Sequence, residues 1–154
     1  MLIKLIAIGT KMPSWIQIGF QEYAQRLPSG YSLALKEIAT PKRAKGSDIN
    51  QLIISEGHKL LAAATDPIIA LDCQGQLWDT PQLAKQLQFW HDSNLNPSFL
   101  IGGPDGLSQD CLKKAKHRWS LSPLTFPHSL VRVVVAEQIY RAWSIINHHP
   151  YHRV

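Results

Sequence analysis

The sequence predicts one α/β domain built on a parallel sheet with helices on both faces. Short apolar segments of strand length alternate with longer amphipathic segments along the chain, which is the pattern of a parallel sheet. The length of 154 residues fits a single domain spanning residues 1–154. A hydrophobic fraction of 45% and a charged fraction of 18% are typical of a globular protein and exclude wholesale disorder.

The first part of the chain is expected to form a strand, a helix and a second strand. The apolar segment Leu2–Ile8 is closed by a glycine, as a buried strand would be. A helix can begin at Pro13 and run through Trp15 and Ile18 toward residue 27, where a Pro-Ser-Gly break follows. Residues 31–38 alternate well enough for a second strand.

A basic loop and three further strand-and-helix pairs are expected to follow. Residues 41–48 are polar and should form the loop, with Ser47 or Asp48 capping the next helix. The remaining elements are a strand at 67–71 that ends at Asp72 and Gly75, a helix that starts at Thr80-Pro81, a strand at 98–101, a helix at 108–117, a strand at 119–121 and a long helix at 129–146. Two buried helix faces are predicted from spacing, Ile49, Ile53, Leu60 and Ala64 in one helix and Leu83, Leu87 and Trp90 in the next.

Three strand ends are expected to meet at one edge of the sheet. They are Leu71-Asp72, the segment 102–106 (Gly-Gly-Pro-Asp-Gly) and the segment 121–126. Ligands of open α/β sheets bind at the carboxyl ends of the strands, and glycines there let a flat ligand approach the main chain. These loops contain almost no cations and no phosphate-binding motif, which favours a nucleoside-like ligand over a triphosphate. An ordinary tight turn is an equally good interpretation of 102–106 taken alone.

The long helix and the tail that follows it carry an unusual concentration of functional side chains. Five of the seven histidines lie from His117 onward. The helix is apolar over most of its circumference, so it must be covered on nearly all sides, either by its own sheet or by another subunit, which favours a homodimer. Glu137, Arg141, Ser144 and His148 share one narrow stripe, while Arg132 points away from it. An ordinary ion pair is the simpler interpretation of Glu137 and Arg141.

Several other site types are disfavoured. Pro150 interrupts the helix that would place His148 and His152 together, so no metal site is expected. No G-x-S-x-G elbow is present, and neither cysteine sits beside a histidine. The two cysteines are expected to be buried free thiols in a reducing cytoplasm. No apolar run is long enough to span a bilayer, and the N-terminus lacks the features of a signal peptide.

A net charge of +5 favours a polyanionic partner. The basic residues form two clusters, at 42–45 and 113–118, which are either solvated surfaces or contacts to a phosphate backbone. Tyr151 and His152 could stack on a base.

Several motifs together give the chain a close resemblance to a known family. They are the segments 7–11, 71–75, 101–107, 125–128, 131–133 and 137–142, and the ending Tyr151-His152-Arg153. In this order and at this chain length they resemble the RlmH family, bacterial large-subunit ribosomal RNA pseudouridine-N3 methyltransferases of the SPOUT class. The departures are small, namely Cys73-Gln74 and the extra Val154, which could alter how Arg153 is held.

The resemblance implies a fold, a cofactor and a substrate. The sheet would carry a C-terminal trefoil knot, whose loops bind S-adenosylmethionine. The enzyme would act in the cytoplasm as a homodimer, without metal or membrane, on a pseudouridine in a stem-loop of 23S ribosomal RNA, within the large subunit or the whole ribosome. By motif match the cofactor-binding residues would be Leu71, Gly102, Gly103, Leu121, Ser122, Pro123, Leu124, Thr125 and Phe126.

Catalysis would require orientation of the base and removal of its N3 proton. The polar groups available for this are His152, Arg141, Glu137, His128, Tyr151 and Arg153, with His152 and Arg141 first. The tail is then expected to be an arm that reaches toward the RNA and the cofactor of a neighbouring subunit. Two other functions stay open from the residues alone: a non-enzymatic ribosome-associated RNA-binding protein, and an enzyme acting on small nucleotides.

Overall fold

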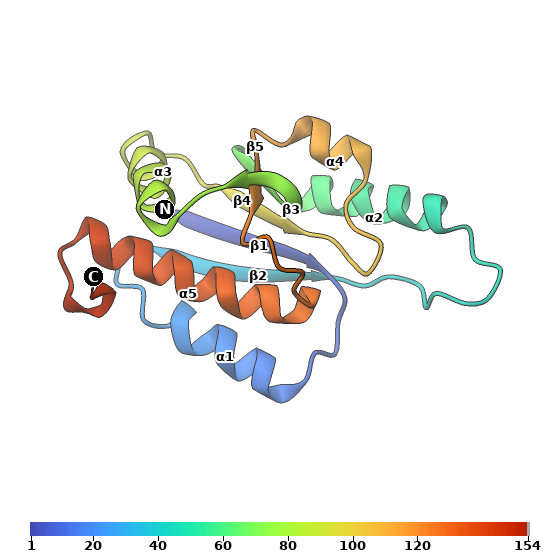
Figure 1. Cartoon of the computed structure of the whole chain (residues 1–154), viewed down its shortest axis with the longest axis horizontal. Coiled ribbons are helices and arrows are strands. Elements are labelled where there is room, and N and C mark those ends of the chain that lie inside the picture. The colour runs from blue at the N-terminus through green and yellow to red at the C-terminus, as the bar shows by residue number, and fades with distance from the viewer. Residues whose placement is uncertain (154) are drawn as a thin grey trace.

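The computed structural model describes residues 1–153, and Val154, one of the two departures from the family pattern, lies outside them. Five parallel strands form one sheet in the order β2-β1-β4-β3-β5 (Figure 1). The elements in chain order are β1 (Leu2–Ile8), α1 (Ser14–Ala24), β2 (Ser32–Ile38), α2 (Ile49–Ala63), β3 (Ile68–Leu77), α3 (Thr80–Asp92), β4 (Ser98–Ile101), α4 (Gln109–Lys114), β5 (His117–Ser120), α5 (His128–Ile146) and the 3-10 turn η1 (Pro150–His152).

Side chains of the central strands divide the core into two layers because successive residues of a strand point to opposite faces. Ile3 and Leu5 of β1 belong to a cluster with side chains of α1, α3 and α5. Ile6 and Ile8 belong to a second cluster with α2 and α4. Figure 1 shows α2 and α4 on one side of the sheet and α1 and α5 on the other. The predicted α/β sheet with helices on both faces is confirmed.

Strand β3 differs from the sequence prediction. It continues to Leu77 instead of ending after residue 71, with an irregularity in its pairing to β5 between Leu71 and Gln76. Gly75 lies so close to β5 that an added Cβ would stand 2.5 Å from the backbone carbon of Arg118. The apolar pattern stops at Asp72 because the strand bulges there, and not because it ends.

The starts of α2 and α3 are formed by capping side chains. The Asp48 carboxylate accepts a hydrogen bond from the amide of Gln51 at 3.3 Å, which selects Asp48 over Ser47 as the cap. In α3 the cap is Asp79, one residue before the expected start, and Asp79 and Gln82 form a reciprocal capping box. The helix face Leu83, Leu87 and Trp90 is buried as predicted.

One expectation about burial was wrong. In the predicted apolar stripe of α2, Ile49 is 37% exposed, whereas Leu60 is buried. In α1 the residues that face the sheet are Ile16 and Phe20, and Trp15 and Ile18 are 60% and 67% exposed.

The two cysteines have different environments, which corrects the expectation of a buried pair. Cys111 is buried and Cys73 is exposed, since Cys73 lies in the bulge of β3 where the strand turns out of the core.

The last helix-strand-helix unit is shifted from its predicted bounds. α4 ends at Lys114, β5 begins at His117, and α5 begins at His128. A trefoil knot is compatible with this strand order and stays a prediction. None of the helices described within residues 1–153 is long and apolar enough to cross a membrane.

Candidate active site

A pocket of about 270 Å³ opens at the carboxyl ends of β3, β4 and β5, where the three strand ends were expected to meet. Its volume lies near the lower end of the range for small-molecule sites. Eight of the nine residues proposed for cofactor binding line it, and they are Leu71, Gly102, Gly103, Leu121, Ser122, Leu124, Thr125 and Phe126. Pro123 belongs to the same loop but does not line the pocket. The arrangement makes these residues candidates, and their contact with a ligand stays a prediction.

The loop between Gly102 and Gly106 is both a tight turn and a wall of the pocket. The Gly106 amide donates to the Gly103 carbonyl at 3.1 Å, and Gly106 has a φ of +83°, which favours glycine. A Cβ on Gly102 would stand 2.6 Å from the carbonyl carbon of Gly106. The two interpretations left open by the sequence are therefore compatible.

The opposite wall of the pocket is the segment from the end of β5 into the following loop, which is held by its own internal hydrogen bonds. The Ser120 hydroxyl donates to the Ser122 carbonyl at 3.1 Å, and the Ser122 hydroxyl accepts from the Leu124 amide at 3.0 Å. These short-range bonds fix the backbone between β5 and α5 without using a charged side chain. The pocket wall is therefore formed before any ligand contributes contacts.

The pocket lining has little charge. It contains no lysine or arginine, and its one carboxylate, Asp72, accepts a hydrogen bond at 2.9 Å from Nε of Arg118 outside the lining. His128 also lines the pocket, and burial, followed by the charges of Arg132 and Arg43, lowers its pKa. The His128 imidazole is therefore neutral near pH 7. This lining suits a nucleoside-like ligand and does not suit a polyphosphate.

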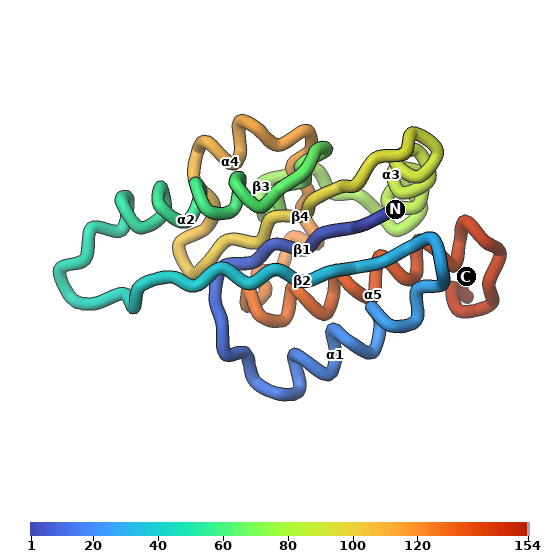
Figure 2. Tube along the Cα trace, turned by 180° about the vertical axis from the view of Figure 1, so that it is seen from behind, coloured from blue at the N-terminus to red at the C-terminus, as the bar shows by residue number. Residues whose placement is uncertain are grey.

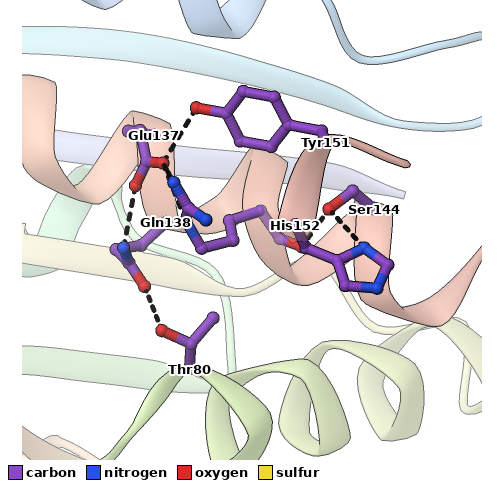
Figure 3. A network of polar contacts seen from close by, with 7 residues as sticks. Thr80, Glu137, Gln138, Ser144, Tyr151 and His152 are labelled. Carbon is purple, nitrogen blue, oxygen red and sulfur yellow. Dashed lines mark hydrogen bonds and ion pairs between the residues drawn. The ribbon is translucent and has the colours of Figure 1, made fainter. Parts of the chain in front are cut away.

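A second polar cluster lies near the other end of α5 (Figure 3). Glu137 Oε1 accepts from Nε of Arg141 at 2.8 Å and from the hydroxyl of Tyr151 at 2.9 Å. Glu137 Oε2 accepts from Nε2 of Gln138 at 2.8 Å, and the amide oxygen of Gln138 accepts from the Thr80 hydroxyl of α3 at 2.7 Å. Both oxygens of this carboxylate are thus used. We call Glu137, Arg141, Ser144, Tyr151 and His152 the tail cluster.

The turn η1 holds the remaining members of the tail cluster against α5. His152 Nδ1 lies 3.2 Å from the hydroxyl of Ser144, and the Arg141 guanidinium lies 4.9 Å from the centre of the Tyr151 ring. Burial and the Glu137 carboxylate raise the pKa of Tyr151, so its phenol acts as a hydrogen-bond donor and not as a base. Arg153 is exposed beyond this turn.

The residues proposed for catalysis therefore fall into two groups within one chain. His128 is the first residue of α5 and lines the pocket, whereas Glu137 begins the tail cluster nine positions later. At 1.5 Å per residue that separation is about 14 Å along the helix. Figure 1 shows the C-terminus beside the far end of α5. One chain does not bring the two groups together.

Sequence reasoning missed several charged residues next to the pocket. Arg132 is 1% exposed; its guanidinium donates to Glu37 at 2.7 Å and to the Gly9 carbonyl at 2.8 Å, joining α5 to the ends of β1 and β2. Glu56, buried in α2, falls at helical spacing within the predicted apolar face between Ile53 and Leu60. A charged residue within a predicted apolar helix face was the sequence signal that could have identified Glu56.

Among residues 1–153 no group of three or more His, Cys, Asp or Glu side chains is placed to hold a metal ion.

Comparison with protein families places the chain in a group of known fold and chemistry. Residues 1–152 match the family described as "Predicted SPOUT methyltransferase". The chain belongs to the SPOUT methyltransferase family.

Two curated relatives resemble the chain over its whole length. Both are named ribosomal RNA large subunit methyltransferase H. The protein of Alkalilimnicola ehrlichii is 53% identical over 154 residues, with 99% of each chain covered. The protein of Hahella chejuensis is 50% identical over 155 residues, also with 99% of each chain covered. The family resemblance read from the sequence motifs is confirmed.

Solved structures agree on the fold. A probable methylase family protein from Haemophilus influenzae has a TM-score of 0.58 at 11% identity, with 99% of this chain and 70% of that chain covered. A putative methylase family protein from Neisseria gonorrhoeae has a TM-score of 0.54 at 14% identity, with 90% of this chain and 81% of that chain covered. Ribosomal RNA small subunit methyltransferase E from Neisseria gonorrhoeae, bound to S-adenosyl methionine, has a TM-score of 0.50 at 9% identity, with 94% of this chain and 66% of that chain covered. These likenesses show that the chain shares the fold of these structures, in agreement with the SPOUT family match.

Proposed function

We propose that this protein uses S-adenosylmethionine to methylate N3 of a pseudouridine in a stem-loop of 23S ribosomal RNA. Membership in a methyltransferase family supports the reaction class. Two full-length relatives above or at 50% identity, both named for the large ribosomal subunit, support the RNA. The observation that carries the proposal is the glycine-walled pocket at the strand ends, whose lining contains no lysine or arginine and includes a neutral histidine.

The pocket residues fit the proposed cofactor. Leu71, Leu121 and Phe126 would contact the adenosine part, and Gly102 with Gly103 would let it approach the main chain. When bound, the cofactor supplies an electrophilic methyl group on a sulfonium sulfur. A lining without lysine or arginine does not repel that positive charge.

The chain must position the base and accept its proton. In the reaction the S–CH₃ bond breaks, an N3–CH₃ bond forms, and the N3 proton leaves to a base. His128 is neutral near pH 7 and lines the pocket, so it has the protonation state of an acceptor. Arg141 stays charged and has N–H groups besides the one bonded to Glu137, so it would act as the donor that orients the base. Tyr151 stays protonated and donates its single O–H to Glu137, so it would hold the carboxylate that positions Arg141.

A second copy of the chain would complete the site. Trp15 and Ile18 expose large apolar surface on α1, which packs against α5. A two-fold pairing through this α1–α5 face can bring the end of one α5 to the beginning of the other. The tail cluster of one protomer would then lie beside the pocket of its partner. This pairing would close the separation of about 14 Å that lies between the pocket and the tail cluster within one chain.

The RNA surface is smaller than the basic sequence clusters suggest. Arg43 and Arg118 are engaged in ion pairs with carboxylates of the protein itself. Lys42 and Lys45 remain exposed in one cluster, as do Lys113, Lys114 and Lys116 in the other. Two copies of each cluster would bind the phosphate backbone of a folded RNA, as expected for a protein of the bacterial cytoplasm where ribosomes are made.

Transfer of a labelled methyl group tests the function. The protein would be incubated with labelled S-adenosylmethionine and with intact ribosomes, separated large subunits, naked 23S RNA or free nucleosides. We expect label in the ribosomal particles, and N3-methylpseudouridine after digestion and mass spectrometry. Cofactor binding without methylation of any RNA sample would contradict the substrate. A protein that binds ribosomes but shows no heat of cofactor binding by calorimetry would be a non-enzymatic factor.

Mixing two defective variants tests the composite site. One variant lacks residues 150–154, and the other carries Gly102→Val in the pocket wall. Each should be inactive alone, whereas a mixture refolded together should recover part of the activity because heterodimers retain one intact site. Sedimentation should give a dimer for the unmodified chain and a monomer for Trp15→Glu/Ile18→Glu. No recovery in the mixture, despite dimers, would place the complete site within one protomer.

A further inference from the structure

Arg43 forms a bridge between helix α2 and the pocket wall. Its guanidinium donates to Oε1 of Glu56 at 2.5 Å and to Oδ2 of Asp105 at 2.5 Å. Glu56 lies on α2, and Asp105 is the one charged residue of the Gly102–Gly106 turn. Three segments far apart in the sequence therefore meet at a single side chain. Figure 2 shows the chain between β2 and α2 running beside the chain that follows β4.

The bridge is buried on its Glu56 side and more open at Asp105, whose side chain is 33% exposed. The side chains of Arg43 and Glu56 are 18% and 5% exposed. Two charge-assisted bonds from one guanidinium hold its geometry more tightly than a surface ion pair would. Without Arg43, the buried Glu56 carboxylate would lose its charge partner and face Asp105 across a small gap, an unfavourable arrangement. The bridge therefore determines where the turn can sit.

The bridge also touches the turn's backbone. A Cβ placed on Gly103 would stand 3.3 Å from Oε2 of Glu56 and 3.5 Å from a terminal nitrogen of Arg43. The same Gly103 lines the pocket on its other side. The ion pair thus supports the pocket wall from behind, while a ligand would contact it from the front. Any shift of the bridge moves backbone that the ligand would touch.

We propose that Arg43 is a positioning residue for cofactor binding, which acts by tying the Gly102–Gly106 turn to Glu56 of α2. This inference rests on the proposed use of S-adenosylmethionine. Arg43 belongs to the basic loop at 42–45, where its charge would otherwise be assigned to RNA contact. In the structure Arg43 instead pairs with two carboxylates of the protein itself. Within this basic loop, its neighbours Lys42 and Lys45 are the cations exposed to a phosphate backbone.

Calorimetry with S-adenosylmethionine on four variants tests this role. Asp105→Asn removes the charged link to the turn but leaves the buried pair intact, so we expect about tenfold weaker binding with an unchanged Tm. Arg43→Met should weaken binding more and also lower Tm, because Glu56 loses its partner. Arg43→Lys should recover only part of the affinity, since a single ammonium does not reproduce the two-pronged contact.

The double variant Arg43→Met/Glu56→Gln separates positioning from stability. It removes both buried charges, so Tm should return toward that of the unmodified protein while cofactor binding stays weak. In methyl transfer its KM for the cofactor should rise much more than its kcat falls. The matched control is Lys59→Gln, which removes an exposed cation from the same helix and should change neither quantity.

Two results would overturn the inference. Cofactor affinity that returns to the unmodified value in the double variant would mean that Arg43 only neutralises Glu56. Unchanged affinity in Asp105→Asn would mean that the link to the turn is not used, whatever the folding of the other variants. If the unmodified chain binds no S-adenosylmethionine, the proposed cofactor itself is wrong and this inference is wrong too. That failure is distinguished from the other two because it appears in the unmodified protein and not only in the variants.

Discussion

The pocket lies at the start of α5, whereas the tail cluster extends from the middle of α5 to the turn that follows it, and the two are built in different ways. The pocket takes its wall from loops after three strands and uses mainly backbone and apolar side chains. The tail cluster takes its members from one helix and the turn that follows it, and uses charged and aromatic side chains. All residues that line the pocket come from one chain, and none of them belongs to the tail cluster. We therefore expect the two proposed roles, cofactor binding and base orientation, to be separable by mutation.

Removal of the tail should have the largest effect. Deleting residues 150–154 keeps the His149 amide, which donates to the Ser144 carbonyl at 2.9 Å at the end of α5. The fold should therefore survive. We expect methyl transfer to fall at least about a hundredfold, because Tyr151, His152 and Arg153 are gone and Arg141 loses the Tyr151 ring that packs on it, while cofactor affinity measured by calorimetry stays the same. If the deletion variant failed to fold, the tail would be needed for stability, and the proposed division of roles between the pocket and the tail cluster would be contradicted.

Gly102→Ala should weaken cofactor binding and leave the tail cluster intact, the converse of the tail deletion. The new methyl group would stand 2.6 Å from backbone of Gly106, so the turn has to move. We expect cofactor binding to weaken by about tenfold or more, about 1.4 kcal/mol. The tail cluster should be unchanged, so its one tyrosine, Tyr151, should keep its contribution to the near-ultraviolet circular dichroism. Normal cofactor binding by this variant would exclude the turn from the site.

Tyr151→Phe should have a moderate effect confined to the chemical step. The change removes the hydroxyl that donates to Glu137 at 2.9 Å and leaves the ring over Arg141. A lost hydrogen bond to a charged group corresponds to about 1.5–3 kcal/mol, so kcat should fall by roughly ten- to a hundredfold. Tyr31→Phe, which alters a ring stacked on His91, is the matched control. An equal loss in both variants would contradict a specific role.

The smallest expected effect is on the pH dependence of stability. Burial lowers the pKa of His128 and of His117 below the ordinary histidine value of 6.5. Below pH 6.5 the unfolded chain then binds more protons than the folded chain, so stability is present above that pH and declines as the pH falls. Urea unfolding between pH 7.5 and about 5 should show this decline, and His117→Gln/His128→Gln should flatten it. An unchanged slope would mean that carboxylates cause the decline.

The fold and the pocket were largely predictable, because each depends on local patterns. Alternating strands and helices, and glycines after β4, are short-range signals that specify a sheet and an edge. The stripe Leu83, Leu87 and Trp90 was buried as its spacing requires. Ile49 was wrongly assigned to the buried face of α2, since periodicity alone does not distinguish the core from an apolar surface.

The electrostatic links were not predictable from local patterns. The Arg43 bridge joins residues 13 and 62 positions away, and Arg132 contacts Glu37 across 95 positions. A basic run gives no indication of which of its members turns inward. Only the three-dimensional arrangement distinguishes Arg43 from Lys42 and Lys45.

The strand order also has a consequence for how the chain folds during synthesis. β1 lies inside the sheet between β2 and β4, and Lys4 pairs with Ser98, 94 positions along the chain. One edge of the first strand made therefore stays unpaired until about two thirds of the chain has been synthesised. Pairings this distant in sequence form slowly and leave apolar strand edges open to aggregation. Chaperone dependence during synthesis should consequently be set by the interval between β1 and β4, and the C-terminal tail should contribute little to it.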